Sequence, residues 1–281
     1  MSTNIKKSAT AKPSASKSAE PKSPQKAAKN APSQFAVVKW SPWAAIIVVI
    51  FTYLAAQIVA INLADLYPLA RHWTKAHSTM WLNSSTVGYF VYILLAEAIT
   101  VALIFGFVRL KKAKFSSIGL QRPKWQDLPL AFIGVVIYFV IYFVAVAILS
   151  KLIPSFNVSQ SQSIGFATST AGWRLILVLL SLVILPPIAE EIMFRGFLYS
   201  GLRRRLPFAA ALIITSLLFA APHLLESKSG GLLYIAGVDT FILSSVLCFI
   251  REKTGRIYAG MGAHGLKNFV AFAALFLVHV H

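Results

Sequence analysis

Long apolar runs, separated by short polar segments, fill the chain from about residue 42 onward. An α-helix needs about 20 apolar residues to cross the hydrocarbon core of a bilayer, and most of these runs reach that length. A transmembrane barrel would instead show segments of about ten residues with alternating hydrophobicity. The pattern therefore predicts an all-α, polytopic helical membrane protein with about seven to eight transmembrane helices. We place seven of them, at about residues 42–64, 86–108, 128–149, 174–202, 207–223, 231–250 and 257–280.

The first 40 residues break this pattern, because they consist mainly of Lys, Ser, Ala and Pro. A segment of this composition cannot bury enough apolar surface to offset the entropy of ordering it, so we expect residues 1–40 to form a disordered basic tail. The first apolar run begins too late for a secretory signal peptide. We interpret the tail as a solvated segment that helps to fix topology, with an electrostatic tether to anionic lipids as the alternative.

Composition and charge agree with a membrane protein. Of all residues, 57% are hydrophobic and only 13% are charged, whereas about a quarter of the residues of a soluble domain are charged. The net charge of +18 would by itself be compatible with a nucleic-acid partner. When the seven predicted helices are threaded, however, 20 of the 27 Lys and Arg residues fall on the side of the N-terminus and 5 on the other side. The positive-inside rule then places the N-terminus in the cytoplasm and explains the charge without nucleic acid.

Ionisable residues interrupt the fourth predicted helix, where they are costly and mark a functional site or a paired structural one. Glu191 and Arg195 are four residues apart, so they face each other on a helix. Glu190 is rotated by about 100° from Glu191 and points elsewhere, which suits a general base. A purely structural ion cluster is the alternative. Pro186 and Pro187 precede the glutamates, and because proline lacks a backbone N–H we expect a kink there.

Two later helices carry polar side chains that reach a similar depth. His223 ends the fifth predicted helix, and His264 and Asn268 are four residues apart on one face of the seventh. At a rise of about 1.5 Å per residue, Glu190 lies about 20 Å from Arg203, His223 about 24 Å from Pro207 and His264 about 12 Å from Arg256. Helix tilt and a late helix start at Gly260 and Gly262 would allow all three to meet near the middle of the bilayer. An imidazole and an amide inside a membrane each need a partner. The alternatives are an interfacial histidine at His223 and interhelical hydrogen bonds at His264 and Asn268.

Three motifs occur in order along these helices: Glu190-Glu191-x-x-x-Arg195-Gly196, Phe219-x-x-x-His223 and His264-x-x-x-Asn268. Together they resemble the motifs of the CPBP intramembrane proteases, the CaaX protease and bacteriocin-processing family. This family is also called Abi and includes the type II CaaX prenyl endopeptidase. The resemblance covers about residues 171–281. It divides the chain into the basic cytoplasmic tail (1–40), N-terminal transmembrane helices (41–170) and a catalytic helical core (171–281).

The resemblance implies an intramembrane endopeptidase that hydrolyses a peptide bond in a lipid-anchored or hydrophobic peptide, in CaaX-like processing or in bacteriocin maturation or immunity. Carried over by position, Glu190 would activate a water molecule with help from His223. His264 and Asn268 would stabilise the oxyanion. These roles are chemically coherent, because an acid–base pair makes the nucleophile and two donors meet the developing charge. The residues with a supporting role would be Glu191 and Arg195.

A metal ion is a second interpretation of the same residues, because the family is often called a metalloprotease. If one is present, Glu190, His223 and His264 would hold zinc with a water molecule in the fourth position. The zinc signature His-Glu-x-x-His is absent from the sequence. The single cysteine, Cys248, provides no Cys-based metal site. We favour a glutamate-activated water and no cofactor.

The expected partners are the lipid bilayer and a hydrophobic or lipidated peptide. The basic cytoplasmic loops are compatible with the bacterial cytoplasmic membrane, where we expect the protein. Two other classes of function stay open. A catalytically silent scaffold or regulator of the same fold would bind a partner in the same cavity. A proton-coupled transporter would use Glu97, Glu190, Asp239 and the histidines as a relay, although the chain lacks the repeated halves common in transporters.

Overall fold

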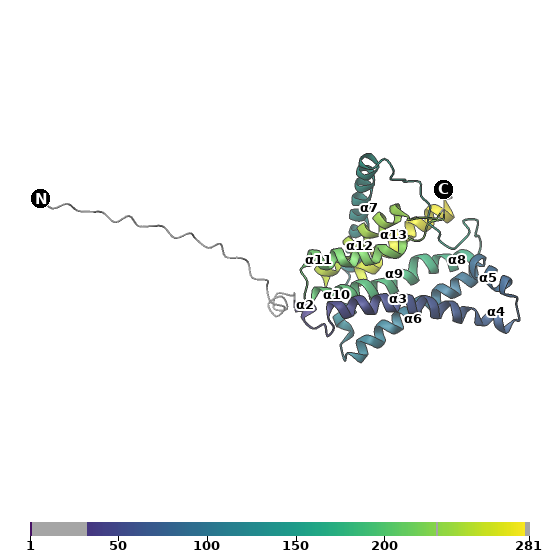
Figure 1. Ribbon diagram of the computed structural model, residues 1–281, viewed down its shortest axis with the longest axis horizontal. Coiled ribbons are helices and arrows are strands. Elements are labelled where there is room, and N and C mark those ends of the chain that lie inside the picture. Colours follow the sequence, from purple (N-terminus) through teal and green to yellow (C-terminus); the bar gives the residue numbers. More distant parts are fainter. Residues whose placement is uncertain (2–32, 229, 279–281) are drawn as a thin grey trace.

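The computed structural model describes Met1, residues 33–228 and residues 230–278, and it confirms the predicted all-α membrane fold (Figure 1). Within these residues, five helices are long and apolar enough to cross a membrane. They are α3 (Pro42–Ala64) with its continuation to Ala70, α6 (Thr86–Leu110), α7 (Asp127–Leu152), a rod from Arg174 to Arg203, and α12 (Tyr234–Thr254). Each overlaps a predicted run, because backbone in lipid must satisfy its hydrogen bonds within a helix or a closed barrel.

Two further helices complete the seven that the pattern predicts. α11 (Phe208–His223) has 16 residues, fewer than an upright span requires. α13 (Tyr258–Phe272) continues into the π-helical segment η4 (Ala273–Leu277) and is less apolar, because it carries three polar residues. No eighth membrane helix occurs in the part of the chain that the structure describes.

Short helices occupy segments that the hydrophobic pattern leaves as tail or loop. They are α2 (Ser33–Ala36), α4 (Leu66–Ala70), α5 (Lys75–Ser84) and the 3₁₀ turn η1 (Phe115–Ile118). Thr74 caps α5 by accepting a hydrogen bond from the backbone N–H of His77 at 3.3 Å. The His77 ring stacks on Trp73 with 4.1 Å between centroids. Such local contacts hold helices that are too short to show a hydrophobic period.

The rod from Arg174 to Arg203 is the central element of the fold. Its segments are α8 (Arg174–Leu179), η2 (Leu180–Ile184), α9 (Leu185–Glu190), η3 (Glu191–Leu198) and α10 (Tyr199–Arg203). η2 and η3 are π-helical, a rare geometry that is frequent at functional sites. The two prolines follow η2 directly, so the wider turn accommodates them and the helix continues instead of breaking (Figure 1).

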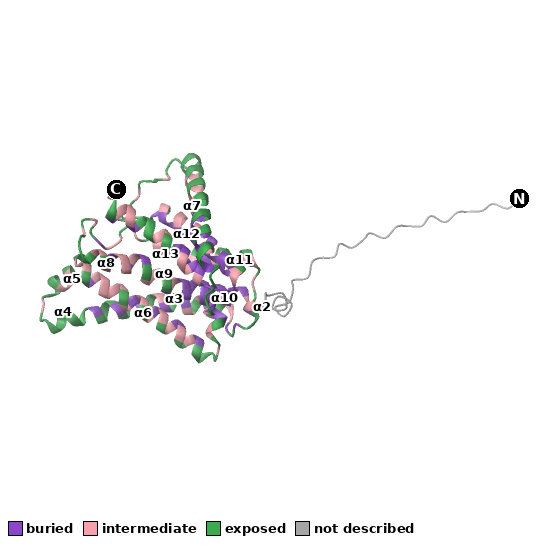
Figure 2. Ribbon diagram, turned by 180° about the vertical axis from the view of Figure 1, so that it is seen from behind, coloured by how far each residue is buried: buried purple, intermediate pink, exposed green. Residues whose placement is uncertain are grey.

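Two groups of helices enclose this rod. α3 and α6 pack on each other and form one group. In the other group, α11 packs on α12, and α7 packs on both α12 and α13. The rod contacts α3 and α6 on one side and α13 on the other. All eight residues of η3 are buried, and buried residues gather around α10 (Figure 2). The outward faces of α3 and α7 expose large apolar side chains such as Phe51 and Phe132. A protein in a bilayer exposes apolar side chains to the lipid, and its ionisable side chains face the interior of the bundle. The outer faces and the rod follow this arrangement.

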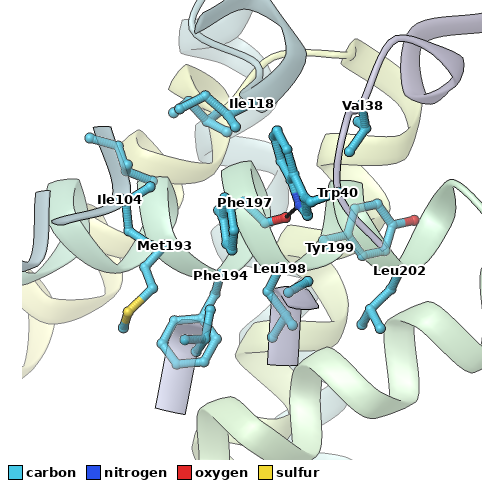
Figure 3. Packing of buried hydrophobic residues seen from close by; sticks show 14 of the residues in the cluster. Val38, Trp40, Ile104, Ile118, Met193, Phe194, Phe197, Leu198, Tyr199 and Leu202 are labelled. Atoms are coloured by element: carbon cyan, nitrogen blue, oxygen red, sulfur yellow. Dashed lines mark hydrogen bonds between the residues drawn. The ribbon is translucent and has the colours of Figure 1, made fainter. Parts of the chain in front are cut away.

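Residues 33–40 correct the predicted boundary of the basic tail. Phe35, Val38 and Trp40 are buried in the same hydrophobic cluster as the rod. Trp40 stacks on Phe197 with 4.6 Å between ring centroids, and its indole N–H donates to the Phe197 carbonyl oxygen at 3.2 Å (Figure 3). The prediction of disorder was wrong for this segment, because three large apolar side chains bury enough surface to order it. The earlier part of the predicted tail, residues 2–32, lies outside the described residues.

Candidate active site

The predicted pair of Glu191 and Arg195 forms at the start of η3. Arg195 Nη1 lies 2.7 Å from Glu191 Oε1, and both side chains are completely buried. The guanidinium carbon lies 4.3 Å from the centroid of the Phe219 ring on α11, which is a cation–π contact. The pair therefore ties the rod to α11 and presents no charge to a substrate.

α13 approaches the two glutamates closely because a glycine faces them. A Cβ atom at Gly260 would lie only 2.7 Å from Glu191 Oε2. One turn later, His264 places Nδ1 3.5 Å from Glu191 Oε1 and Nε2 3.7 Å from Glu190 Oε2. The His264 ring lies edge-on to Phe219, with 5.8 Å between centroids. The structure thus brings the first and third motifs together, with the imidazole between the two carboxylates.

Asn268 faces a backbone carbonyl group that loses its helical hydrogen bond because of the two prolines. Pro186 and Pro187 have no N–H to donate to the carbonyl groups four residues earlier, at Leu182 and Val183. Asn268 Nδ2 donates to the Leu182 carbonyl oxygen at 2.9 Å. A side-chain amide has two N–H groups, so this bond orients Asn268 and leaves one N–H for another acceptor.

His223 approaches from the last turn of α11. Its Nδ1 lies 3.0 Å from the backbone carbonyl oxygen of Phe219. A carbonyl oxygen only accepts, so this contact favours a proton on Nδ1. The other ring nitrogen, Nε2, is then left as a proton acceptor.

One cavity of about 380 Å³ connects these side chains. The residues of the three motifs that line it are Glu190, Phe219, His223, His264 and Asn268. The cavity is bordered by α3, α6, the rod, α11, α12 and α13, and by residues 162–164 of the loop before the rod. Glu191 and Arg195 lie behind this wall and are inaccessible. The four residues predicted to take part in catalysis therefore share one space, and the two predicted to support them do not reach it.

The described side chains do not form a preassembled metal site. Within the described residues, no three His, Cys, Asp or Glu side chains are placed to hold one. His223 Nδ1 is engaged by a backbone carbonyl group, which leaves its Nε2 open, and His264 directs its nitrogens toward two different glutamates. Contacts of this kind also orient zinc-bound histidines, but Glu190, His223 and His264 are not gathered around one point in the described structure.

Another ion pair faces the cavity from α12 and α13. Lys267 Nζ lies 2.8 Å from Asp239 Oδ2, and Tyr138 of α7 donates its hydroxyl hydrogen to the other carboxylate oxygen. Both charged residues line the cavity. Their signal in the sequence is an ionisable side chain inside an apolar run, but no spacing rule pairs residues on different helices.

Comparison with known families gives a match over the region of the site. Residues 172–270 match the family model described as Type II CAAX prenyl endopeptidase Rce1-like. This stretch is similar to that family. It begins just before the rod and ends in α13, so the Rce1-like stretch contains every residue of the three motifs. The resemblance predicted from the motifs is thereby confirmed, and it supports a membrane-embedded protease of the CAAX type. No curated protein and no solved structure matches the chain.

Gly260→Ala is expected to destabilise the protein by about 1–3 kcal/mol. The added methyl group would lie 2.7 Å from the Glu191 carboxylate, which Arg195 holds in place. Thermal unfolding in detergent measures the effect. Gly106→Ala is the matched control, because a Cβ there meets no atom within 4 Å and alanine is the better helix former. Equal melting of the two variants would contradict the close approach of α13 to Glu191.

Proposed function

We propose that the chain is an intramembrane endopeptidase that hydrolyses a peptide bond in a lipid-anchored or hydrophobic peptide. The observation that carries the proposal is the shared cavity, where a carboxylate, two imidazoles and an amide meet from three helices. The Rce1-like match over the same helices supports this class of reaction. The cavity opens among helices that cross the bilayer, so an apolar or lipidated peptide is the substrate class that can reach it.

Glu190 is the proposed general base. It takes a proton from a water molecule in the cavity, and the hydroxide attacks the carbonyl carbon of the scissile bond. His223 assists through Nε2, which is free to accept a hydrogen bond from the same water. When the tetrahedral intermediate collapses, the Glu190 carboxyl group passes its proton to the leaving amine. Positioned proton transfer of this kind contributes about 10²- to 10⁴-fold to the rate.

His264 and Asn268 are the proposed donors to the oxyanion. His264 donates through Nε2 when that nitrogen carries the proton, and its imidazole is held between Phe219 and the glutamates. Asn268 donates through the N–H that its bond to Leu182 leaves over. Donors that are fixed before the reaction are effective because they need no reorganisation as charge develops. We propose that Glu191 and Arg195 position this set by fixing the rod against α11.

The proposed setting is the bacterial cytoplasmic membrane with the N-terminus in the cytoplasm. The uneven distribution of Lys and Arg supports this orientation. Figure 1 shows α2 and α10 at one end of the bundle and α4 and α5 at the other. The basic residues after α10 would then lie on the cytoplasmic side, and the loop before the rod, which contains residues 162–164, would lie on the opposite side.

Cleavage of a defined peptide panel tests the proposed function. The purified full-length protein is incubated in detergent with matched hydrophobic peptides, each with and without a prenyl group, and products are identified by mass spectrometry. We expect one cleaved bond, and we expect a strong chelator to leave the rate unchanged. Loss of cleavage with chelator would contradict the metal-free mechanism. Failure to cleave any lipidated or hydrophobic peptide would contradict the protease and favour a silent scaffold or a transporter.

A further inference from the structure

A carboxylate without a partner faces the active-site cavity from α6. Glu97 lies near the middle of this helix and lines the same cavity as Glu190. The acidic side chains of the bundle that have a hydrogen-bonded or ion-paired partner are Asp127, Glu190, Glu191, Glu226, Asp239 and Glu252. Glu97 makes neither kind of contact within the described part of the chain. An ionisable group in the middle of a membrane-crossing helix marks a functional site by default.

Aromatic side chains line the same cavity. They include Tyr53 of α3 and Tyr89 and Tyr92 of α6, which is also the helix of Glu97. Tyr92 donates its hydroxyl hydrogen to Gln57 Oε1, and its ring lies 5.7 Å from the Tyr89 ring, measured between centroids. The electron-rich faces of such rings attract ammonium and guanidinium groups, and a nearby carboxylate strengthens the attraction.

The Tyr89 ring packs against Gly165, in the loop before the rod that also contributes residues 162–164 to the cavity. A Cβ atom at Gly165 would lie 2.2 Å from this ring, and the backbone there has a φ of +74° that glycine adopts readily. The same loop is fixed to the α11–α12 connection by the bond from Ser163 N to Glu226 O at 2.7 Å. The aromatic wall is therefore preformed.

The charges that line the cavity do not balance. Its one lysine, Lys267, is already paired with Asp239. Arg195 is paired with Glu191 and lies outside the cavity. Of the other three carboxyl groups that line it, Glu190 has the His264 ring at 3.7 Å and Glu226 accepts a hydrogen bond from Gln162. Glu97 has no cation beside it among the described residues. In a site of low dielectric constant such a surplus strongly favours a positively charged ligand.

We propose that Glu97, Tyr53 and Tyr92 form a subsite that binds a cationic side chain, Lys or Arg, of the peptide that is cleaved. The proposal rests on the proposed function, which places the scissile bond beside Glu190 in the same cavity. A cation held by Glu97 would fix the register of the peptide across the cavity. The subsite thereby determines which bond of an otherwise apolar peptide reaches the base.

A pair of peptides that differ in one charge tests the subsite. Lysine is compared with norleucine at each position around the cleaved bond, in a detergent whose headgroup carries no cation. We expect wild-type protein to prefer lysine at one position by about tenfold or more in kcat/KM. In Glu97→Gln that ratio should fall to about one, and in Glu97→Lys a peptide with glutamate at the same position should become the better substrate. Asp65→Asn, an exposed carboxylate outside the cavity, is the matched control and should keep the wild-type ratio.

Binding to a protein that lacks the proposed base separates this proposal from the proposed function. The dissociation constants of the lysine and norleucine peptides are measured with Glu190→Gln by fluorescence anisotropy. Preferential binding of the lysine peptide supports the subsite even if no wild-type cleavage is seen, a result that would contradict only the protease. Equal kcat/KM and equal Kd for the two peptides at every position overturn the subsite and leave the protease intact. A lysine preference that survives in Glu97→Gln overturns the assignment to Glu97.

Discussion

Glu190→Gln is expected to reduce peptide cleavage by about a hundredfold to ten-thousandfold while the protein stays folded. The amide has nearly the same size as the carboxylate but cannot take a proton from water. Glu190 lies on the cavity wall, and its distance to the imidazole nitrogen His264 Nε2 is 3.7 Å, which is too long for a strong bond. Little folding energy should therefore depend on the carboxylate.

The measurement is kcat/KM on one cleaved peptide, together with thermal unfolding in the same detergent. Asp65→Asn is again the control, because it changes an exposed carboxylate to an amide outside the cavity. A folded Glu190→Gln protein that cleaves at the wild-type rate would show that another group is the base. Loss of both folding and cleavage would instead assign a structural role to Glu190.

The helices of this protein could be predicted from the sequence because lipid leaves the backbone few choices. A run of about 20 apolar residues in a bilayer is a helix, and its ends carry local signals. Ser41, for example, accepts a hydrogen bond from the Ala44 N–H at 3.2 Å, directly before Pro42 opens α3. Depth could be predicted only approximately, although helical rise converts residue number into height. The rise alone put Glu190 and His264 at different heights and allowed them to meet only with helix tilt, and the structure places His264 Nε2 3.7 Å from Glu190 Oε2.

Helix neighbours and helix rotation could not be predicted. Apolar side chains distinguish poorly between lipid tails and other helices, so small residues and polar contacts set the packing. Here the missing side chain of Gly260 lets α13 lie close to Glu191, and Lys267 forms an ion pair with Asp239 on the preceding helix. Both contacts join residues of different helices, so they form only when those helices pack together. Residues 33–40 show an error of another kind. The composition averaged over residues 1–40 predicted disorder, whereas Phe35, Val38 and Trp40 are buried against the rod.

Asn268 shows how a site residue can carry a second contact that its motif does not indicate. The motif resemblance implies an oxyanion donor, and the structure adds a bond to the Leu182 carbonyl group. Counting four residues back from Pro186 identifies Leu182 as an open acceptor. The sequence does not say that Asn268 fills it, because the partner comes from another helix.

Arg195→Ala is expected to lower the free energy of unfolding by about 3–5 kcal/mol, and cleavage should fall with it. The substitution leaves the Glu191 carboxylate buried without its cation and removes the contact with the Phe219 ring. Unfolding in detergent at a fixed protein concentration measures the loss. Arg205→Ala, two residues after the end of the rod, is the matched control, because Arg205 is exposed and has no ion pair in the described residues. An Arg195→Ala protein that melts like Arg205→Ala would contradict the pairing.

A double variant separates the stranded charge from the lost packing. Arg195→Met combined with Glu191→Gln removes both charges and keeps most of the buried volume. Because the cost of breaking a buried ion pair comes mainly from the partner left behind, the double variant should regain much of the stability that Arg195→Ala loses. Cleavage should stay low, since the pair also holds the rod against α11 beside His264. Recovery of both properties would mean that the pair only neutralises charge, and recovery of neither would mean that the cation–π contact and shape dominate.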